Sequence, residues 1–152
     1  MNHTDLFDDH QGPPIRDIDV PDGHLTLYKS FFDESTANQA FASLEHELAW
    51  RQDTITIAGK PVPIPRLQAW YGEKNTEYTY SGLKLTPKPW TDTLLEIKSQ
   101  VEVSAGISFN SMLANLYRDG QDSVSWHSDD EKELGNNPVI ASVSFGATRN
   151  FV

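Results

Sequence analysis

Two stretches of the chain space their apolar residues with the period of an α-helix. Asp33 precedes the first stretch, where a carboxylate can cap a helix N-terminus. A proline-containing break at residues 87–89 precedes the second stretch, and Gly106 follows it as a C-cap. The pattern predicts two amphipathic helices that support a sheet, with apolar stripes of Ala37, Ala40, Phe41, Leu44 and Leu48 in the first and Leu94, Ile97, Val101 and Ala105 in the second.

Other stretches alternate apolar and polar residues, as half-buried strands do. Residues 25–28 form one short example. Within residues 50–71, Ile55 and Ile57 alternate before Ala58-Gly59-Lys60, which predicts a β-hairpin.

Further strands are expected nearer the C-terminus. Residues 113–117 alternate, Asp119-Gly120 is a strong turn, and residues 124–127 are expected to return antiparallel. Residues 139–145 alternate as a buried strand, and Gly146-Ala147 then turns the chain. The sequence therefore predicts a mixed α+β protein.

The chain divides into a polar start and one domain. Residues 1–23 are rich in Asp and contain Pro13-Pro14, so a flexible arm is expected there. Residues 24–152 have the length of a domain with a single core. The absence of cysteine excludes disulfides and thiolate metal sites. No apolar run approaches the ~20 residues that cross a bilayer and no signal pattern opens the chain, so we expect a cytoplasmic protein without membrane contact.

The formal net charge of -10 argues against nonspecific affinity for a polyanion, because phosphate binding usually needs lysine and arginine. A nucleic-acid enzyme of this composition would have to gather its cations on one face. The middle of the chain holds Arg51, Lys60, Arg66, Lys74, Lys84 and Lys88. On composition alone, a solvated surface explains these cations equally well.

The most specific candidate for chemistry is His127-Ser128-Asp129. In an extended strand alternate side chains share a face, so His127 and Asp129 could converge on one point. An imidazole and a carboxylate suit a divalent transition metal, and a second His would complete the facial triad of non-heme Fe(II) oxygenases. The triplet alone is weak evidence, but the preceding hairpin would bring Asn115 and Tyr117 beside it.

Several blocks in the same order and spacing resemble the AlkB family of Fe(II)- and 2-oxoglutarate-dependent dioxygenases, and most closely its branch that repairs N-alkylated bases in duplex DNA. The resemblance extends from about Leu25 to the last residue. The blocks are residues 65–72 (PRLQAWYG), 78–82 (YTYSG), 87–90 (PKPW), 115–120 (NLYRDG), 127–131 (HSDDE) and 141–147 (ASVSFGA).

The resemblance implies a double-stranded β-helix, or jelly roll, with supporting helices but without its final strands. It implies Fe(II) as the metal, 2-oxoglutarate as co-substrate and O2 as oxidant. His127 and Asp129 would be catalytic metal ligands, the third ligand, a His, being absent from the chain. Asn115 and Tyr117 would bind the co-substrate.

The resemblance also assigns residues to the substrate. Tyr80 would stack on a flipped base opposite His127, where aromatic stacking is worth ~1 to 3 kcal/mol per base. Tyr78 and Arg66 would line the same pocket, and Asp130 and Glu131 would contact the edge of the base. The turn at Ile57, Ala58 and Gly59 corresponds to a finger that enters the base stack, and its lack of a Phe leaves single-stranded substrates open.

The implied activity is DNA repair by oxidative demethylation of bases of the 1-methyladenine and 3-methylcytosine type, which releases formaldehyde and succinate. Family members continue for several dozen residues beyond the position of Val152, so we expect the chain to be a fragment that is inactive alone and monomeric when complete. Two other classes remain open. They are a non-catalytic nucleic-acid binding module and an oxygenase acting on RNA, protein or a small molecule.

Overall fold

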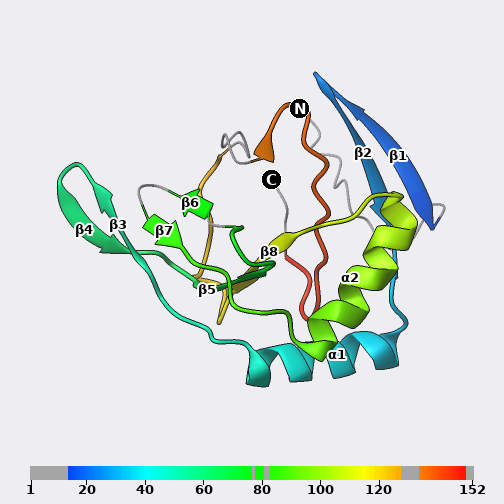
Figure 1. Ribbon diagram of the computed structural model, residues 1–152, viewed down its shortest axis with the longest axis horizontal. Helices are drawn as coiled ribbons and strands as arrows, with labels where there is room; N and C mark the ends of the chain where they lie inside the picture. The colour runs from blue at the N-terminus through cyan, green and yellow to red at the C-terminus, as the bar shows by residue number, and fades with distance from the viewer. Residues whose placement is uncertain (1–13, 77, 81–82, 128–133, 150–152) are drawn as a thin grey trace.

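The computed structural model describes residues 14–76, 78–80, 83–127 and 134–149, except for the side chains of residues 78–80 and 83. The described part mixes two helices with short antiparallel strands (Figure 1), which confirms the α+β prediction. The elements are β1 (Ile15–Val20), β2 (Gly23–Tyr28), α1 (Glu34–Glu47), β3 (Thr54–Ile57), β4 (Lys60–Pro63), β5 (Leu67–Gly72), β6 (Tyr78–Tyr80), β7 (Leu83–Leu85), α2 (Asp92–Ala105) and β8 (Ser111–Leu116).

Strand β5 is the centre of this arrangement. It pairs antiparallel with β8, from Leu67 opposite Leu116 to Gly72 opposite Ser111. Its other edge is bonded to the chain segments at Arg51 and Lys88. The remaining described strands pair as β1 with β2, β3 with β4 and β6 with β7. Because chain segments flank both edges of β5 and the helices cover one face, β5 is largely buried.

The core lies between one face of the β5–β8 pair and the two helices. Ala69 and Tyr71 on β5 pack with Leu48 and with Leu94 of α2. The Tyr71 hydroxyl accepts a 3.0 Å hydrogen bond from the Ala49 N–H, which anchors the chain after α1. Since side chains alternate along a strand, the neighbouring positions of β5 and β8 face away from the helices.

Both predicted helices form, with the expected caps. The Asp33 carboxylate accepts a 2.7 Å bond from the Thr36 N–H at the start of α1. Gly106 ends α2 in the left-handed region, with φ of 69°. The Thr91 hydroxyl, which the sequence analysis did not consider, caps the start of α2 by accepting from the Leu94 N–H at 3.2 Å. Among the described residues, no helix is both long enough and apolar enough to pass through a bilayer.

The predicted hairpin around residues 58–60 also forms, and it projects from the rest of the molecule (Figure 1). Ala58 and Gly59 have φ of 49° and 77°, the positive values that a tight two-residue hairpin turn requires. Pro61 and Pro63 on β4 fall at positions that do not donate across this pair, because Ile57 and Lys60 form the hydrogen-bonded pair at the turn. The ladder therefore tolerates both prolines.

A strand that the sequence analysis missed lies in the stretch expected to be an arm. Residues 15–20 form β1, and its pairing with β2 runs from Ile15 opposite Tyr28 to Val20 opposite Gly23. Both strands are mostly exposed, so their hydrophobic pattern is weak. The turn Pro21-Asp22-Gly23 was the available signal. Residues 1–13 lie outside the described part.

Two strand predictions are wrong. Residues 124–127 form no strand, and the strand that pairs with β8 is β5. Residues 139–145 form no ladder within the described part and are not buried, with Val139 59% and Ile140 52% exposed. Alternation marks residues that suit a strand, but a strand also needs a hydrogen-bonded neighbour. The expected bend at Gly146 is present, with φ of 85°.

Candidate functional site

The ring of His127 is oriented by the backbone. Its Nδ1 lies 2.8 Å from the carbonyl oxygen of Ser125. A carbonyl can only accept, so Nδ1 carries the proton and the neutral ring has its lone pair on Nε2. A backbone carbonyl on the second nitrogen is the usual companion of a metal-binding His. The His127 side chain therefore fits the role of iron ligand that the family resemblance implies.

The other predicted ligand is not tested by this geometry. Asp129, Asp130 and Glu131 lie outside the described residues. Within the described ranges, no three His, Asp or Glu side chains are grouped so that they could hold a metal ion. The prediction that His127 and Asp129 form a metal pair thus stays a prediction.

Asn115 and Arg66 form the next part of the site. Asn115 is the second-last residue of β8, opposite Gln68, on the face away from the helices. Its Oδ1 accepts a 2.9 Å hydrogen bond from Nε of Arg66, which is 5% exposed. Because this bond occupies the amide oxygen, the NH₂ group of Asn115 is directed elsewhere and can donate to a carboxylate. The structure therefore brings together two residues that the sequence analysis had assigned to different pockets.

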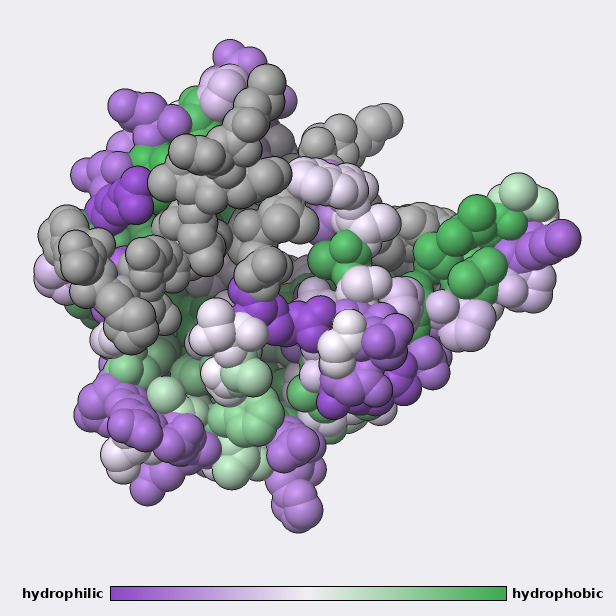
Figure 2. All heavy atoms as spheres, turned by 180° about the vertical axis from the view of Figure 1, so that it is seen from behind, coloured by the Kyte–Doolittle hydropathy of each residue, from purple (hydrophilic) through white to green (hydrophobic). Residues whose placement is uncertain are grey.

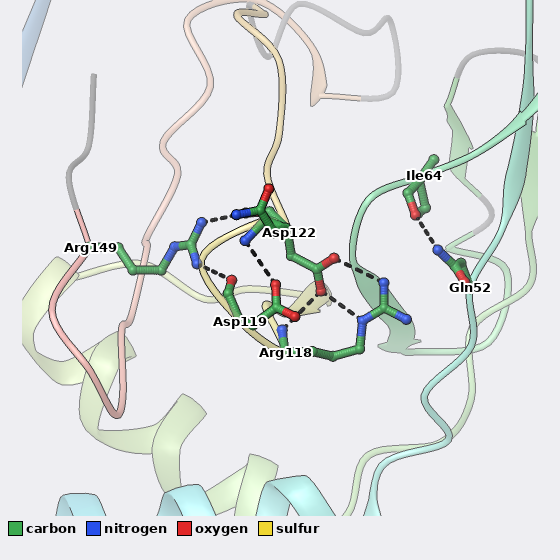
Figure 3. Close-up of polar contacts among 7 residues, drawn as sticks. Gln52, Ile64, Arg118, Asp119, Asp122 and Arg149 are labelled. Carbon is green, nitrogen blue, oxygen red and sulfur yellow. Dashed lines mark hydrogen bonds and ion pairs between the residues drawn. The ribbon is translucent and has the colours of Figure 1, made fainter.

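Tyr117 follows the end of β8 and stacks against Arg149. The Arg149 guanidinium carbon lies 4.3 Å from the centre of the Tyr117 ring. Its two terminal nitrogens donate to the carbonyl oxygens of Asp119 and Asp122, at 3.0 and 2.5 Å (Figure 3). No role was predicted for Arg149 from the sequence, and its side chain joins the chain after residue 146 to the turn after β8.

The same turn is closed from the other side by Arg118. Its Nε and Nη2 donate to the two carboxylate oxygens of Asp122 at 2.7 and 2.9 Å, and its backbone N–H donates to the same carboxylate (Figure 3). The Arg118 side chain and backbone together lower the pKa of the buried Asp122 carboxyl from 3.8 to about 2. This pair was not predicted from the sequence, although an Arg and an Asp four positions apart around Asp119-Gly120 could have indicated it.

A backbone bond joins these parts into one region. The Ser123 N–H donates to the Pro65 carbonyl at 2.7 Å, so the turn after β8 lies beside the residues that precede β5. Arg66, Asn115 and Tyr117 therefore lie at the same end of the β5–β8 pair.

The predicted base-stacking residues are placed only in part. Tyr78 and Tyr80 belong to β6, which pairs with β7, but their side chains lie outside the described atoms. The predicted finger residues Ile57, Ala58 and Gly59 stand at the tip of the projecting hairpin, with Ile57 53% exposed. Figure 2 shows apolar surface gathered along this projection.

Comparison with known proteins gives consistent results. The model of the 2OG-Fe(II) oxygenase superfamily matches residues 24–152. Alpha-ketoglutarate-dependent dioxygenase alkB homolog 3 of Bos taurus is 48% identical over 128 residues, which cover 84% of this chain and 44% of that protein. The human protein of the same name is 46% identical over the same shares. Human DNA oxidative demethylase ALKBH2 is 41% identical over 144 residues, covering 93% of this chain and 55% of that protein.

The chain spans about half the length of the curated relatives that it matches. Their names confirm the resemblance to the AlkB family, and the matched range agrees with the expected extent of that resemblance. The chain belongs to the 2OG-Fe(II) oxygenase superfamily.

Proposed function

We propose that this chain carries the metal- and base-binding part of an Fe(II)- and 2-oxoglutarate-dependent dioxygenase that demethylates N-alkylated bases in DNA. Relatives named as alpha-ketoglutarate-dependent dioxygenases and DNA oxidative demethylases support this reading. The observation that carries it is the His127 ring, whose Nδ1 is committed to the Ser125 carbonyl so that Nε2 bears the lone pair. Asp129 is proposed as the second ligand.

Bound iron, 2-oxoglutarate and O2 would supply the oxidative chemistry, in which the co-substrate loses CO2 to become succinate and the N-methyl carbon is hydroxylated and leaves as formaldehyde. The protein's residues supply orientation. Asn115, held through its oxygen by Arg66, would donate its NH₂ group to a co-substrate carboxylate. The Tyr117 hydroxyl would donate a second bond to the same ligand.

The proposed base pocket uses Tyr80 for stacking, with Tyr78 beside it. Asp130 and Glu131 would face the base edge, since an alkylated base can carry positive charge that a carboxylate stabilises. Because the methyl group is not accessible inside the stack, the base has to leave the helix. The exposed tip of the β3–β4 hairpin would support that step by entering the gap. We also propose that the β5–β8 pair belongs to a double-stranded β-helix.

The test is formaldehyde release by the product of the complete reading frame, supplied with Fe(II), ascorbate, 2-oxoglutarate and DNA containing 1-methyladenine or 3-methylcytosine. We expect release that depends on 2-oxoglutarate and is lost in His127→Ala. An Arg16→Ala variant in the exposed β1–β2 hairpin serves as the control and should retain the activity.

Absence of formaldehyde from every methylated DNA, with a folded protein and bound iron, would overturn the proposal. Formaldehyde release from methylated RNA but not from methylated DNA would show that the substrate is RNA. A methylated oligonucleotide that fails to compete with a protein or small-molecule substrate would place the enzyme in another class.

A further inference from the structure

Arg149 contacts the turn after β8 in three ways. Its guanidinium lies over the face of the Tyr117 ring, 4.3 Å from the ring centre. The same group donates to the carbonyl oxygens of Asp119 and Asp122. Figure 3 shows the Arg149 side chain reaching the turn from a separate segment of the chain.

These three contacts fix the orientation of the guanidinium. A planar group that donates to two backbone carbonyls cannot tilt without losing one of the bonds. The fixed guanidinium plane therefore covers one face of the Tyr117 ring, and the attraction between the cation and the π electrons of the ring holds the two groups together. The direction of the phenol hydroxyl is consequently restricted by a residue 32 positions away in sequence.

The turn does not depend on Arg149 alone. Arg118 holds the carboxylate of Asp122 by two side-chain bonds and one backbone bond. These bonds direct the Arg118 guanidinium toward the Asp122 carboxylate. The two arginines therefore share the turn, and within the described residues it is Arg149 that lies over the ring.

We propose that Arg149 is a positioning residue that holds the Tyr117 ring and thereby directs its hydroxyl toward the carboxylate of 2-oxoglutarate. This inference rests on the proposed function, in which Tyr117 binds the co-substrate. It assigns Arg149 no contact with the co-substrate itself. Loss of Arg149 should therefore weaken co-substrate binding only as long as the Tyr117 hydroxyl is present.

The test compares Arg149→Met with Arg118→Met in the product of the complete reading frame. Arg149→Met should raise the KM for 2-oxoglutarate about fivefold with little change in kcat, since a stacking contact of modest strength is lost. Arg118→Met removes the bonds to the Asp122 carboxylate but keeps the guanidinium of Arg149 over the Tyr117 ring, so that KM should stay within about twofold of wild type. Arg149→Lys, which keeps the charge but not the planar fork, should fall between wild type and Arg149→Met.

A double-variant cycle identifies the group through which Arg149 acts. In a Tyr117→Phe background, the added Arg149→Met change should have no further effect on the KM for 2-oxoglutarate. An undiminished effect there, or an equal rise of KM in Arg118→Met, would overturn the proposal and leave Arg149 as a support of the turn.

A readout independent of activity uses 3-fluorotyrosine and fluorine NMR, with Tyr117→Phe to assign the signal. The Tyr117 signal should become motionally averaged in Arg149→Met and remain unchanged in Arg118→Met. An unchanged signal in Arg149→Met would overturn the ring contact whether or not the enzyme is active. If the wild-type protein releases no formaldehyde, the proposed function fails, and the fluorine signal still decides whether Arg149 holds Tyr117.

Discussion

At the scale of single residues, the orientation of Asn115 depends on its partner. An amide can be turned either way, but only its oxygen can accept from Arg66 Nε. The buried arginine thus selects which end of the amide is presented to a ligand. The orientation of the Asn115 side chain is therefore set by Arg66, which lies 49 positions earlier in the sequence.

Replacing Asn115 by Asp should weaken co-substrate binding without lowering the stability of the fold. A carboxylate would strengthen the bond to Arg66, so the melting temperature should not fall. The same carboxylate would repel the dianionic co-substrate, and its affinity should drop by at least about tenfold. Thermal unfolding and the KM for 2-oxoglutarate are the two measurements. Equal KM values for the variant and the wild type would remove Asn115 from the co-substrate site.

The depressed pKa of Asp122 predicts a specific acid sensitivity. The carboxyl has a pKa of about 2 in the folded chain against 3.8 ordinarily, so its stabilising contribution is present above the unfolded value and is lost as pH falls toward the folded value. Asp122→Asn should be less stable than wild type above about pH 4, and this gap should close by about pH 2. Urea unfolding at several pH values measures it, and a gap that stays constant down to pH 2 contradicts the prediction.

At the scale of elements, β5 and β8 meet with little space at Gly72. A methyl group there would lie 2.8 Å from both the Asn110 carbonyl oxygen and Ser111 Cβ. Gly72→Ala should therefore cost about 1–3 kcal/mol of unfolding free energy, as overpacking usually does. Gly120→Ala is the matched control, because nothing lies within 4 Å of that position and its φ is not positive. Similar denaturation midpoints for the two variants would argue against a tight junction.

Local patterns predicted the elements whose stabilising contacts are local. The caps at Asp33 and Gly106 and the turn at Ala58-Gly59 depend on neighbours in sequence, and all three formed as expected. Residues 124–127 and 139–145 failed because a strand needs a partner whose position no local pattern gives. The exposed β1 was missed because it lacks a clear apolar face.

The candidate site shows the same division. The family resemblance singled out Arg66, Asn115 and Tyr117, and the structure places them at one end of the β5–β8 pair. The resemblance could not indicate that Arg66 contacts Asn115. Nor could it indicate that the Arg149 side chain donates to two carbonyl groups, 27 and 30 residues earlier in the chain. Such contacts follow from tertiary structure alone.

At the scale of the whole molecule, the helices and the β5–β8 pair form the packed body, and the β3–β4 hairpin extends from it (Figure 1). If the tip enters the base stack, Ile57→Thr should lower kcat/KM on duplex DNA about fivefold and leave single-stranded DNA almost unchanged. Threonine keeps the strand preference, so the hairpin itself should persist.

The matched control for that variant is Val103→Thr on α2, which replaces an 82% exposed apolar residue outside the hairpin. Val103→Thr should change the activity on neither duplex nor single-stranded DNA. Equal losses on duplex and single-stranded DNA in Ile57→Thr would show that the tip does not assist base extrusion. Formaldehyde release from matched oligonucleotides is the measurement.

The two prolines of β4 have a consequence beyond the hairpin. At positions 61 and 63 the N–H groups would have pointed outward, so the free edge of β4 offers no donors there to an approaching chain. Exposed apolar edges ordinarily recruit further strands and promote fibrous aggregation. Pro61 and Pro63 therefore disfavour the growth of intermolecular sheets from that edge, although the hairpin carries an apolar tip.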